Sequence, residues 1–165
     1  ALWFSGDMVA QRVFEKPADG HNWRRTASLT TFGLALAGPI YSWWYPFLDG
    51  RTQHVLARHG MMRFVALKIA ADQLVFEPPF LALFFFSTGL MQGDSVSTVA
   101  RRIKQDGVST YLVDCCVWPA AQFVNFRYVP VMYQALVVNG VSVGWTTFLS
   151  WFSHRALESD DAPPP

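Results

Sequence analysis

The chain has 165 residues and a formal net charge of +1, and 52% of its residues are hydrophobic against 15% that are charged. This composition is too apolar for an ordinary soluble domain of this length and indicates an integral membrane protein. The near-neutral charge and the lack of a basic face interleaved with aromatic residues exclude nucleic acid as a partner.

No arrangement of residues indicates catalysis. The four histidines, which are His21, His54, His59 and His154, fall in predicted loops or at a helix end, so none can pair within the membrane to ligate haem. Metal-ligand spacing, a phosphate-binding loop and a G-x-S-x-G motif are all missing. Cys115 and Cys116 suit inert buried thiols, with a redox or palmitoylation role as the alternative. We expect no enzyme activity, metal or cofactor.

The first apolar segment, residues 1–14, is short for a membrane span. About 14 helical residues cover only ~21 Å, whereas the hydrocarbon core is ~30 Å thick. We therefore expect this helix to begin before Ala1. Residues 15–25 follow, and their composition is typical of a solvated loop; they include Lys16, Pro17, Asp19, Gly20, His21, Arg24 and Arg25.

The second apolar segment, residues 27–48, has no charged side chain and is long enough to cross a bilayer. Asp49 and Gly50 are expected to end it. Small or ring-constrained residues should let another helix pack closely; these are Gly33, Ala37, Gly38 and Pro39. Four aromatic residues are typical of an interfacial belt, with a ligand-stacking site as the alternative; these are Tyr41, Trp43, Trp44 and Tyr45.

The third apolar segment, residues 64–91, is interrupted by polar residues and two prolines. Pro78 and Pro79 are expected to break or kink the helix, because proline lacks an amide hydrogen and clashes with the preceding turn. Lys68 and Asp72 are four residues apart and can pair along one helix face. Such a pair is either a buried structural contact or part of a pore lining or proton relay.

Residues 92–110 are polar and basic, with Val96, Val99 and Ile103 at helical spacing. This pattern predicts a short amphipathic helix on the membrane surface that begins at Ser95. Its expected role is a connector lying in the interface, and recognition of anionic lipids is the alternative.

Residues 111–152 carry few charges and are long enough for two helices, which Pro130 is expected to separate. Gly140 and Gly144 form a GxxxG pair, which is a helix-packing signal. The tail, residues 156–165, is acidic and rich in proline, and we predict that it is disordered.

Polar side chains recur within the most apolar part of the chain. Asp114, Trp118, Gln122 and Asn125 are spaced four, four and three residues apart, so on a helix they share one face. Because polar groups are costly in hydrocarbon, this face should point away from lipid. We predict a polar hub or pore lining formed by Lys68, Asp72, Gln73, Asp114, Gln122, Asn125 and Arg127.

Short motifs extend over about residues 3 to 155. They are Gly6-Asp7 with Gln11; Gly38-Pro39, Trp44-Tyr45 and Leu48-Asp49; Lys68 with Asp72-Gln73 and Pro78; and Trp118-Pro119, Gln122, Asn125-Phe126, Val129-Pro130, Trp145 and Leu149-Ser150. In this order they resemble the four-helix membrane family named for the Mpv-seventeen protein and the 22-kilodalton peroxisomal membrane protein. Gln134 and Thr146 depart from the family pattern, which usually has an arginine and an asparagine there.

The resemblance implies a small multi-pass protein of the mitochondrial inner membrane or of peroxisomes. It implies a link to organelle homeostasis, no enzyme activity, and a weakly selective channel as a proposed activity. The two departures weaken the case for a charged pore, because one of them removes an arginine.

We predict an all-α, multi-pass transmembrane helix bundle with about four spanning helices, proline breaks and a short amphipathic surface helix, as one domain over residues 1–155. The favoured function is a non-enzymatic structural or accessory subunit of the mitochondrial inner membrane, with the peroxisomal membrane as the alternative location. Its expected partners are lipids and a larger membrane complex or further copies of itself. The alternative function is a weakly selective small-solute channel lined by Lys68, Asp72, Gln122, Asn125 and Arg127.

Overall fold

The computed structural model describes residues 2–15, 20–129 and 131–160, without the side chains of residues 15, 49, 125–127, 131–132, 134–136, 139 and 153–160. All its regular segments are helical, which confirms the predicted all-α class for the described residues. The segments are α1 (Leu2–Val9), η1 (Ala10–Glu15), α2 (Trp23–Phe32), η2 (Gly33–Ala37), α3 (Gly38–His59), α4 (Met61–Ala71), η3 (Asp72–Phe76), α5 (Glu77–Gln92), α6 (Val96–Tyr128) and α7 (Val131–Asp160), where η marks a π-helical turn.

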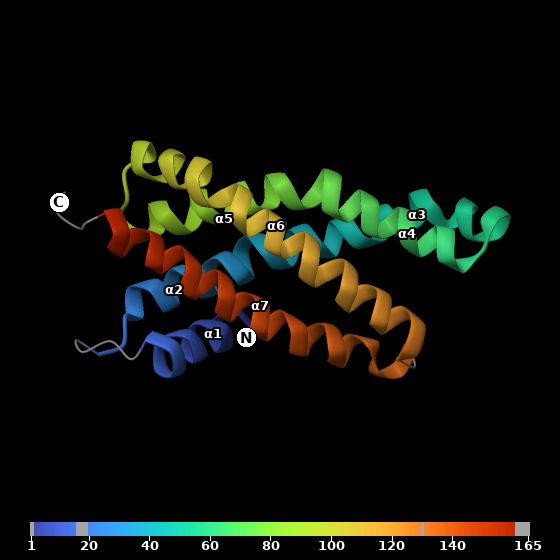
Figure 1. The fold of residues 1–165 in the computed structure, drawn as a ribbon, viewed down its shortest axis with the longest axis horizontal. Helices are drawn as coiled ribbons and strands as arrows, with labels where there is room; N and C mark the ends of the chain where they lie inside the picture. The colour runs from blue at the N-terminus through green and yellow to red at the C-terminus, as the bar shows by residue number, and fades with distance from the viewer. Residues whose placement is uncertain (1, 16–19, 130, 161–165) are drawn as a thin grey trace.

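The helices form an elongated bundle in which α7 crosses between α1 and α6 (Figure 1). Two sharp turns fold the chain back on itself. Gly60 has a φ of 81° between α3 and α4, and Gly93 has a φ of 93° at the end of α5. Glycine adopts positive φ without the steric cost that a side chain brings, so these reversals pack α3 against α4 and α5 against α6.

The second segment is longer than the sequence predicts. One helical path runs from Trp23 to His59 through α2, η2 and α3, so it does not end at Asp49 and Gly50. The helix begins after Asn22, whose Oδ1 accepts a hydrogen bond from the Arg25 amide at 3.0 Å. Arg25 is only 2% exposed, and the prediction that it belongs to a solvated loop was wrong.

The proline breaks are only partly present. The third segment stays helical from Met61 to Gln92. Pro78 and Pro79 occupy the first turn of α5, where the amide groups are not needed for hydrogen bonds within that helix, so the missing amide hydrogens cost little stability. Pro119 lies inside α6 without ending it. The break near Pro130 is confirmed, since α6 ends at Tyr128 and α7 begins at Val131, although Pro130 itself lies outside the described residues.

The predicted surface helix is not a separate element, and this expectation was wrong. Ser95 does cap a helix, since its Oγ accepts from the Thr98 amide at 3.2 Å, but that helix is α6, which continues to Tyr128. Between Ser95 and Pro119 the sequence has no proline that would stop the helix earlier. The face that includes Val99, which is 1% exposed, packs on α5 instead of lying on lipid.

Within the described residues, one helical path is both long and apolar enough to cross a membrane, and it is Met61–Gln92. The four-span bundle is therefore not established by hydropathy. The second segment, residues 27–48, contains tryptophan, tyrosine, glycine and proline, which favour interfaces or helix packing and contribute little hydropathy. At the other end, α7 runs to Asp160, so residues 156–160 of the predicted tail are helical, and residues 161–165 lie outside the description.

Aromatic side chains fill the core, and α1 packs closely against η2 there. Trp3 packs edge-on against Phe32 with ring centroids 5.0 Å apart and stacks on Phe84 at 5.4 Å. A Cβ atom on Gly33 would lie 2.2 Å from the Trp3 ring, so a glycine is required for this contact. Of the other predicted packing residues, Ala37 is buried, Gly38 and Pro39 are exposed, and Gly140 and Gly144 face open space.

Candidate functional site

A buried ion pair joins α1 to α2 and ties both to α7. The Arg25 Nε lies 2.8 Å from Asp7 Oδ1, and the two side chains are 2% and 0% exposed. Ser150 on α7 completes the contact, because its Oγ accepts from Arg25 Nη2 at 2.7 Å and donates to Asp7 Oδ1. The charges are thus desolvated but paired and hydrogen-bonded, which is the condition under which buried charges persist.

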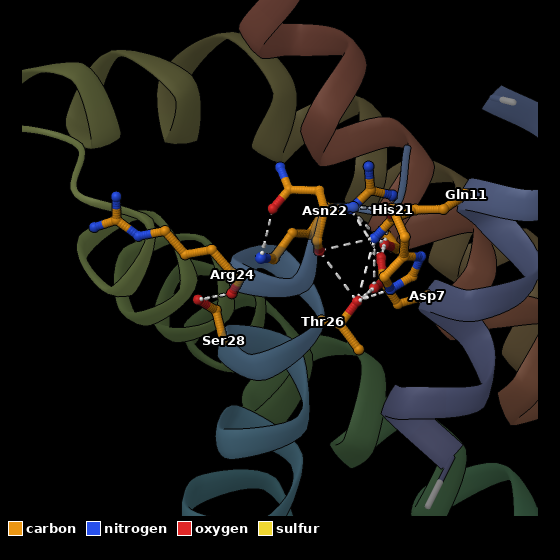
Figure 2. A network of polar contacts seen from close by, with 9 residues as sticks. Asp7, Gln11, His21, Asn22, Arg24, Thr26 and Ser28 are labelled. Atoms are coloured by element: carbon orange, nitrogen blue, oxygen red, sulfur yellow. Dashed lines mark hydrogen bonds and ion pairs between the residues drawn. The ribbon is translucent and has the colours of Figure 1, made fainter. Parts of the chain in front are cut away.

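Neutral side chains satisfy the second oxygen of Asp7. Figure 2 shows Asp7 of α1, Gln11 of η1 and Thr26 of α2 converging. Gln11 Nε2 donates to Asp7 Oδ2 at 2.8 Å, and the Thr26 hydroxyl donates to the same oxygen. Gln11 Oε1 also accepts from the Asn22 amide at 2.7 Å, and His21 Nε2 lies 2.8 Å from Thr26 Oγ1. This buried network fixes the loop entry to α2 against the first helix.

This buried polar network was not predicted from the sequence. Gly6-Asp7, Gln11 and Leu149-Ser150 were noted only as motifs of the family resemblance, and Arg25 was placed in a loop. Asp7, Gln11 and Ser150 are polar residues in apolar surroundings, and this placement could have indicated that they bond to one another.

A cavity of about 370 Å³, called the central cavity below, lies between the helices and reaches the bundle surface at the exposed residues Leu34, Gly38 and Tyr45. Its walls come from α1, α2, η2, α3, η3, α5, α6 and α7, so nearly every helical segment contributes. Aromatic and small side chains form most of the lining, and the polar groups are Thr30, Tyr41, Tyr45, Asp72, Gln73, Glu77, Ser142 and Thr146. A largely apolar cavity with a few polar groups is typical of a small-molecule site.

The acidic part of this lining comes from the middle of the membrane-capable path Met61–Gln92. Asp72 and Gln73 lie on η3, and Glu77, which is 6% exposed, begins α5. Trp44 Nε1 donates to Asp72 Oδ1 at 2.8 Å, which holds that carboxylate at the cavity wall. Tyr111 donates from its hydroxyl to the Gln73 carbonyl oxygen at 2.8 Å, which fastens α6 to the π-turn.

Several buried polar atoms around the cavity have no hydrogen-bond partner in the described part of the chain. They are Thr30 Oγ1, Gln73 Oε1 and Gln122 Oε1. Asp114 is 0% exposed and lies beside Gln73 and Glu77. Since unpaired buried polar groups are costly, these atoms indicate that water or a solute occupies the space between the helices.

A second cavity of about 70 Å³ adjoins the first. The two share Tyr45, Asp72, Gln73 and Trp118 in their walls, so these four residues lie between them. The smaller cavity is also lined by residues of the predicted hub, which are Lys68 and Gln122, together with Leu48, Ile69 and Pro119. The Lys68 Nζ lies 5.1 Å from the centroid of the Phe64 ring.

The structure thus places four of the seven predicted hub residues, Lys68, Asp72, Gln73 and Gln122, on the linings of the two adjoining cavities, and a fifth, Asp114, beside Gln73. Glu77 was omitted from the prediction, although it lies one helical turn after Gln73. The side chains of Asn125 and Arg127 lie outside the described residues, so their predicted roles stay predictions. Among the described residues, no cluster of His, Cys, Asp and Glu suits a metal ion.

The predicted aromatic belt divides into two sets. Trp43 is 64% exposed, whereas Trp44 is 7% exposed and bonded to Asp72. Tyr41 and Tyr45 line the central cavity, with their rings stacked 5.7 Å apart. The belt assignment was therefore wrong for Trp44 and for Tyr41, which packs against Phe76 and Phe80.

The chain is similar to curated proteins along most of its length. A Dictyostelium discoideum protein named PXMP2/4 family protein 4 is 32% identical over 130 residues, which are 79% of this chain and 68% of that protein. Protein SYM1 of Saccharomyces cerevisiae is 32% identical over 165 residues, with coverage of 99% and 84%. The Drosophila melanogaster "Mitochondrial inner membrane protein Mpv17" is 34% identical over 151 residues, with coverage of 91% and 88%. No solved structure matches the chain.

A family profile agrees with these pairwise similarities. The profile described as the Mpv17 / PMP22 family matches residues 89–150. The predicted mitochondrial inner-membrane location is confirmed at the level of the relatives, since those from Drosophila melanogaster and Danio rerio carry it in their names. The resemblance read from the motifs is confirmed as well: this chain belongs to the Mpv17 / PMP22 family.

Proposed function

We propose that this protein is a non-enzymatic, multi-pass protein of the mitochondrial inner membrane that forms a pathway for small solutes. The central cavity is its solute-holding chamber. One observation carries the proposal: the helical path best suited to span the membrane places Asp72, Gln73 and Glu77 at its middle, and all three line the cavity. Ionisable groups at this depth are expensive unless they serve a water-filled or solute-filled space.

The two adjoining cavities support a pathway over an isolated pocket. Asp72 and Gln73 belong to both walls, so a solute that leaves the larger cavity meets the smaller one after passing these residues. Lys68 and Gln122 extend the polar lining toward α4 and α6. Polar groups around an opening are the basis of solute selection in membrane pores.

Two π-turns lie where the pathway is formed. η2 supplies Gly33 and Ala37 to the central cavity, and η3 supplies Asp72 and Gln73. A π-turn widens a helix locally and interrupts its regular hydrogen bonding, and such turns are frequent at functional sites. Their presence on two facing helical paths supports a functional cavity in place of a packing defect.

Single-channel recording of the purified full chain in planar bilayers tests the proposal. We expect discrete conductance steps, and a lower unit conductance for cations in Asp72→Asn and Glu77→Gln, because each variant removes an acidic group from the lining. Asp106→Asn, an acid of α6 outside both cavity linings, is the matched control and should conduct as the wild type does. Silence from folded protein, or equal conductance in all four proteins, would refute the pathway.

The accessory-subunit function is a second candidate, which a separate observation favours. Gly140 and Gly144 lie on α7, and no atom of the described residues comes within 4 Å of a Cβ atom added to either, so this small-residue face is open on the described side chains. A GxxxG face lets a second helix approach closely in a membrane. Native mass spectrometry of gentle detergent extracts should then detect a partner or a second copy, and Gly140→Leu should remove it while Gly50→Leu does not.

A further inference from the structure

Carboxyl groups outnumber basic groups around the two cavities. Asp72 and Glu77 line the central cavity, and Asp114 lies beside Glu77 with 0% exposure. The described lining of the central cavity contains no lysine, arginine or histidine, and Lys68 of the smaller cavity is the one base along the two described linings. Lys68 is a positive charge near Asp72, and Glu77 lies against Asp114, so three carboxyl groups face one base. A lining with this excess of acidic groups favours a cation over an anion.

The same cavity presents aromatic rings from four helices, and one of these rings is Trp3 of α1. Tyr41 and Tyr45 stack on α3 with centroids 5.7 Å apart. Trp118 of α6 meets Trp145 of α7 edge to face at 6.4 Å. Aromatic faces attract cations that lie within about 6 Å of the ring centroid, tryptophan most strongly, and several such rings together recognise quaternary ammonium groups.

An unpaired polar atom points to an occupant. Gln73 is 7% exposed and lines the cavity, yet its Oε1 has no hydrogen-bond partner among the described residues. The volume of about 370 Å³ lies within the range of about 300–1,000 Å³ that small-molecule sites occupy. A bare metal ion would need a shell of oxygen ligands, whereas most of this lining is aromatic or aliphatic.

We propose that the central cavity binds a small organic cation, of the class of quaternary ammonium compounds and protonated amines. Its charged group lies between Asp72 and Glu77, its alkyl groups contact the tyrosine and tryptophan rings, and Gln73 Oε1 accepts a hydrogen bond from any donor that it carries. This inference rests on the proposed function, because it names the class of solute that the same chamber holds.

Binding of radiolabelled choline to the full chain in lipid nanodiscs tests the inference. Choline has a quaternary ammonium group, and 3,3-dimethyl-1-butanol has the same shape without the charge. We expect saturable choline binding that tetramethylammonium displaces and the neutral alcohol does not. This comparison uses the wild-type protein alone, so it does not depend on any variant folding correctly.

Variants then locate the site. Glu77→Gln keeps the shape of the side chain and removes its charge, and Trp118→Leu removes one ring face. We expect each to weaken choline binding by about tenfold, as for the loss of a desolvated cation contact. Asp106→Asn and Trp43→Leu change an acid and a tryptophan outside the described cavity linings and should bind choline as the wild type does.

The outcomes separate this inference from the pathway. A protein that conducts ions but binds no choline, or that binds the neutral alcohol equally well, would overturn the organic-cation site alone. Unchanged affinity in both Glu77→Gln and Trp118→Leu would also overturn it. A protein that binds choline as expected but never conducts would support the site and contradict the proposed pathway.

Discussion

Replacement of Arg25 by glutamine tests the buried network at its most charged point. The guanidinium and the Asp7 carboxylate are 2% and 0% exposed and lie 2.8 Å apart, so neither reaches water. Removal of one partner from a buried ion pair leaves the other charge uncompensated, at a cost of about 3–5 kcal/mol. We expect Arg25→Gln to lower the free energy of unfolding by about that amount.

Ser150→Ala should have a smaller effect. The hydroxyl accepts from Arg25 and donates to Asp7, but the ion pair persists without it. The loss of a buried hydrogen-bond partner costs about 1–3 kcal/mol, and we expect a decrease in that range.

Reversible unfolding of the full chain by SDS in mixed micelles, followed by circular dichroism, measures these differences. Arg58→Gln, at an exposed position in the last turn of α3, is the control and should change the unfolding free energy by about 0.5 kcal/mol or less. A double-mutant cycle of Asp7→Asn with Arg25→Gln should give a coupling energy of about 0.5–3 kcal/mol. An effect of Arg25→Gln no larger than that of Arg58→Gln, or a cycle without coupling, would refute the reasoning.

Two further predictions concern packing and a single hydrogen bond. A Cβ atom on Gly6 would lie 2.9 Å from the backbone carbon of Thr146. Gly6→Ala should therefore lower the free energy of unfolding by about 1–3 kcal/mol in the same SDS assay. Gly140→Ala, where an added Cβ atom meets open space, is the control and should not lower it measurably. Trp44→Phe removes the donor to the Asp72 carboxylate and should cost about 1.5–3 kcal/mol. Trp43→Phe, at an exposed position, is the control. Equal unfolding free energies for Trp44→Phe and Trp43→Phe would contradict a stabilising hydrogen bond from Trp44 to Asp72.

Local signals in the sequence predicted a good part of this fold. The apolar segments, the cap at Ser95 and the separation of two helices at Pro130 each depend on a few neighbouring residues. The spacing of Asp114, Trp118 and Gln122 also predicted a face turned from lipid, and Asp114 is 0% exposed. Such features follow from helix periodicity and backbone chemistry alone.

The aromatic belt was predicted from composition, which does not say which side of a helix each aromatic residue occupies. An α-helix advances by about 100° per residue, so the additional residue that a π-turn accommodates rotates every later side chain onto a different face. η2 lies directly before the aromatic residues of α3, and Trp44 accordingly lies in the core while Trp43 is exposed. Composition alone therefore could not separate the buried Trp44 from the exposed Trp43.

The ion pair could not be predicted for a different reason. Arg25 and Ser150 are 125 residues apart in the chain, and their contact exists only because α7 returns beside α1 and α2. Local composition instead placed Arg25 with the charged residues of a loop. The pairing of distant polar side chains is a property of tertiary packing, which periodicity does not encode.

The accessibility of a cavity residue to water tests the central claim most directly. In a chain whose Cys115 and Cys116 are replaced by serine, Ser142→Cys places a thiol on the lining of the central cavity, and Ala35→Cys places one on the exposed surface of η2 within the second apolar segment. In reconstituted vesicles, a membrane-impermeant cationic methanethiosulfonate should modify the thiol at position 142 and leave the one at position 35 unmodified. Equal protection of both thiols would contradict a solute pathway through the bundle.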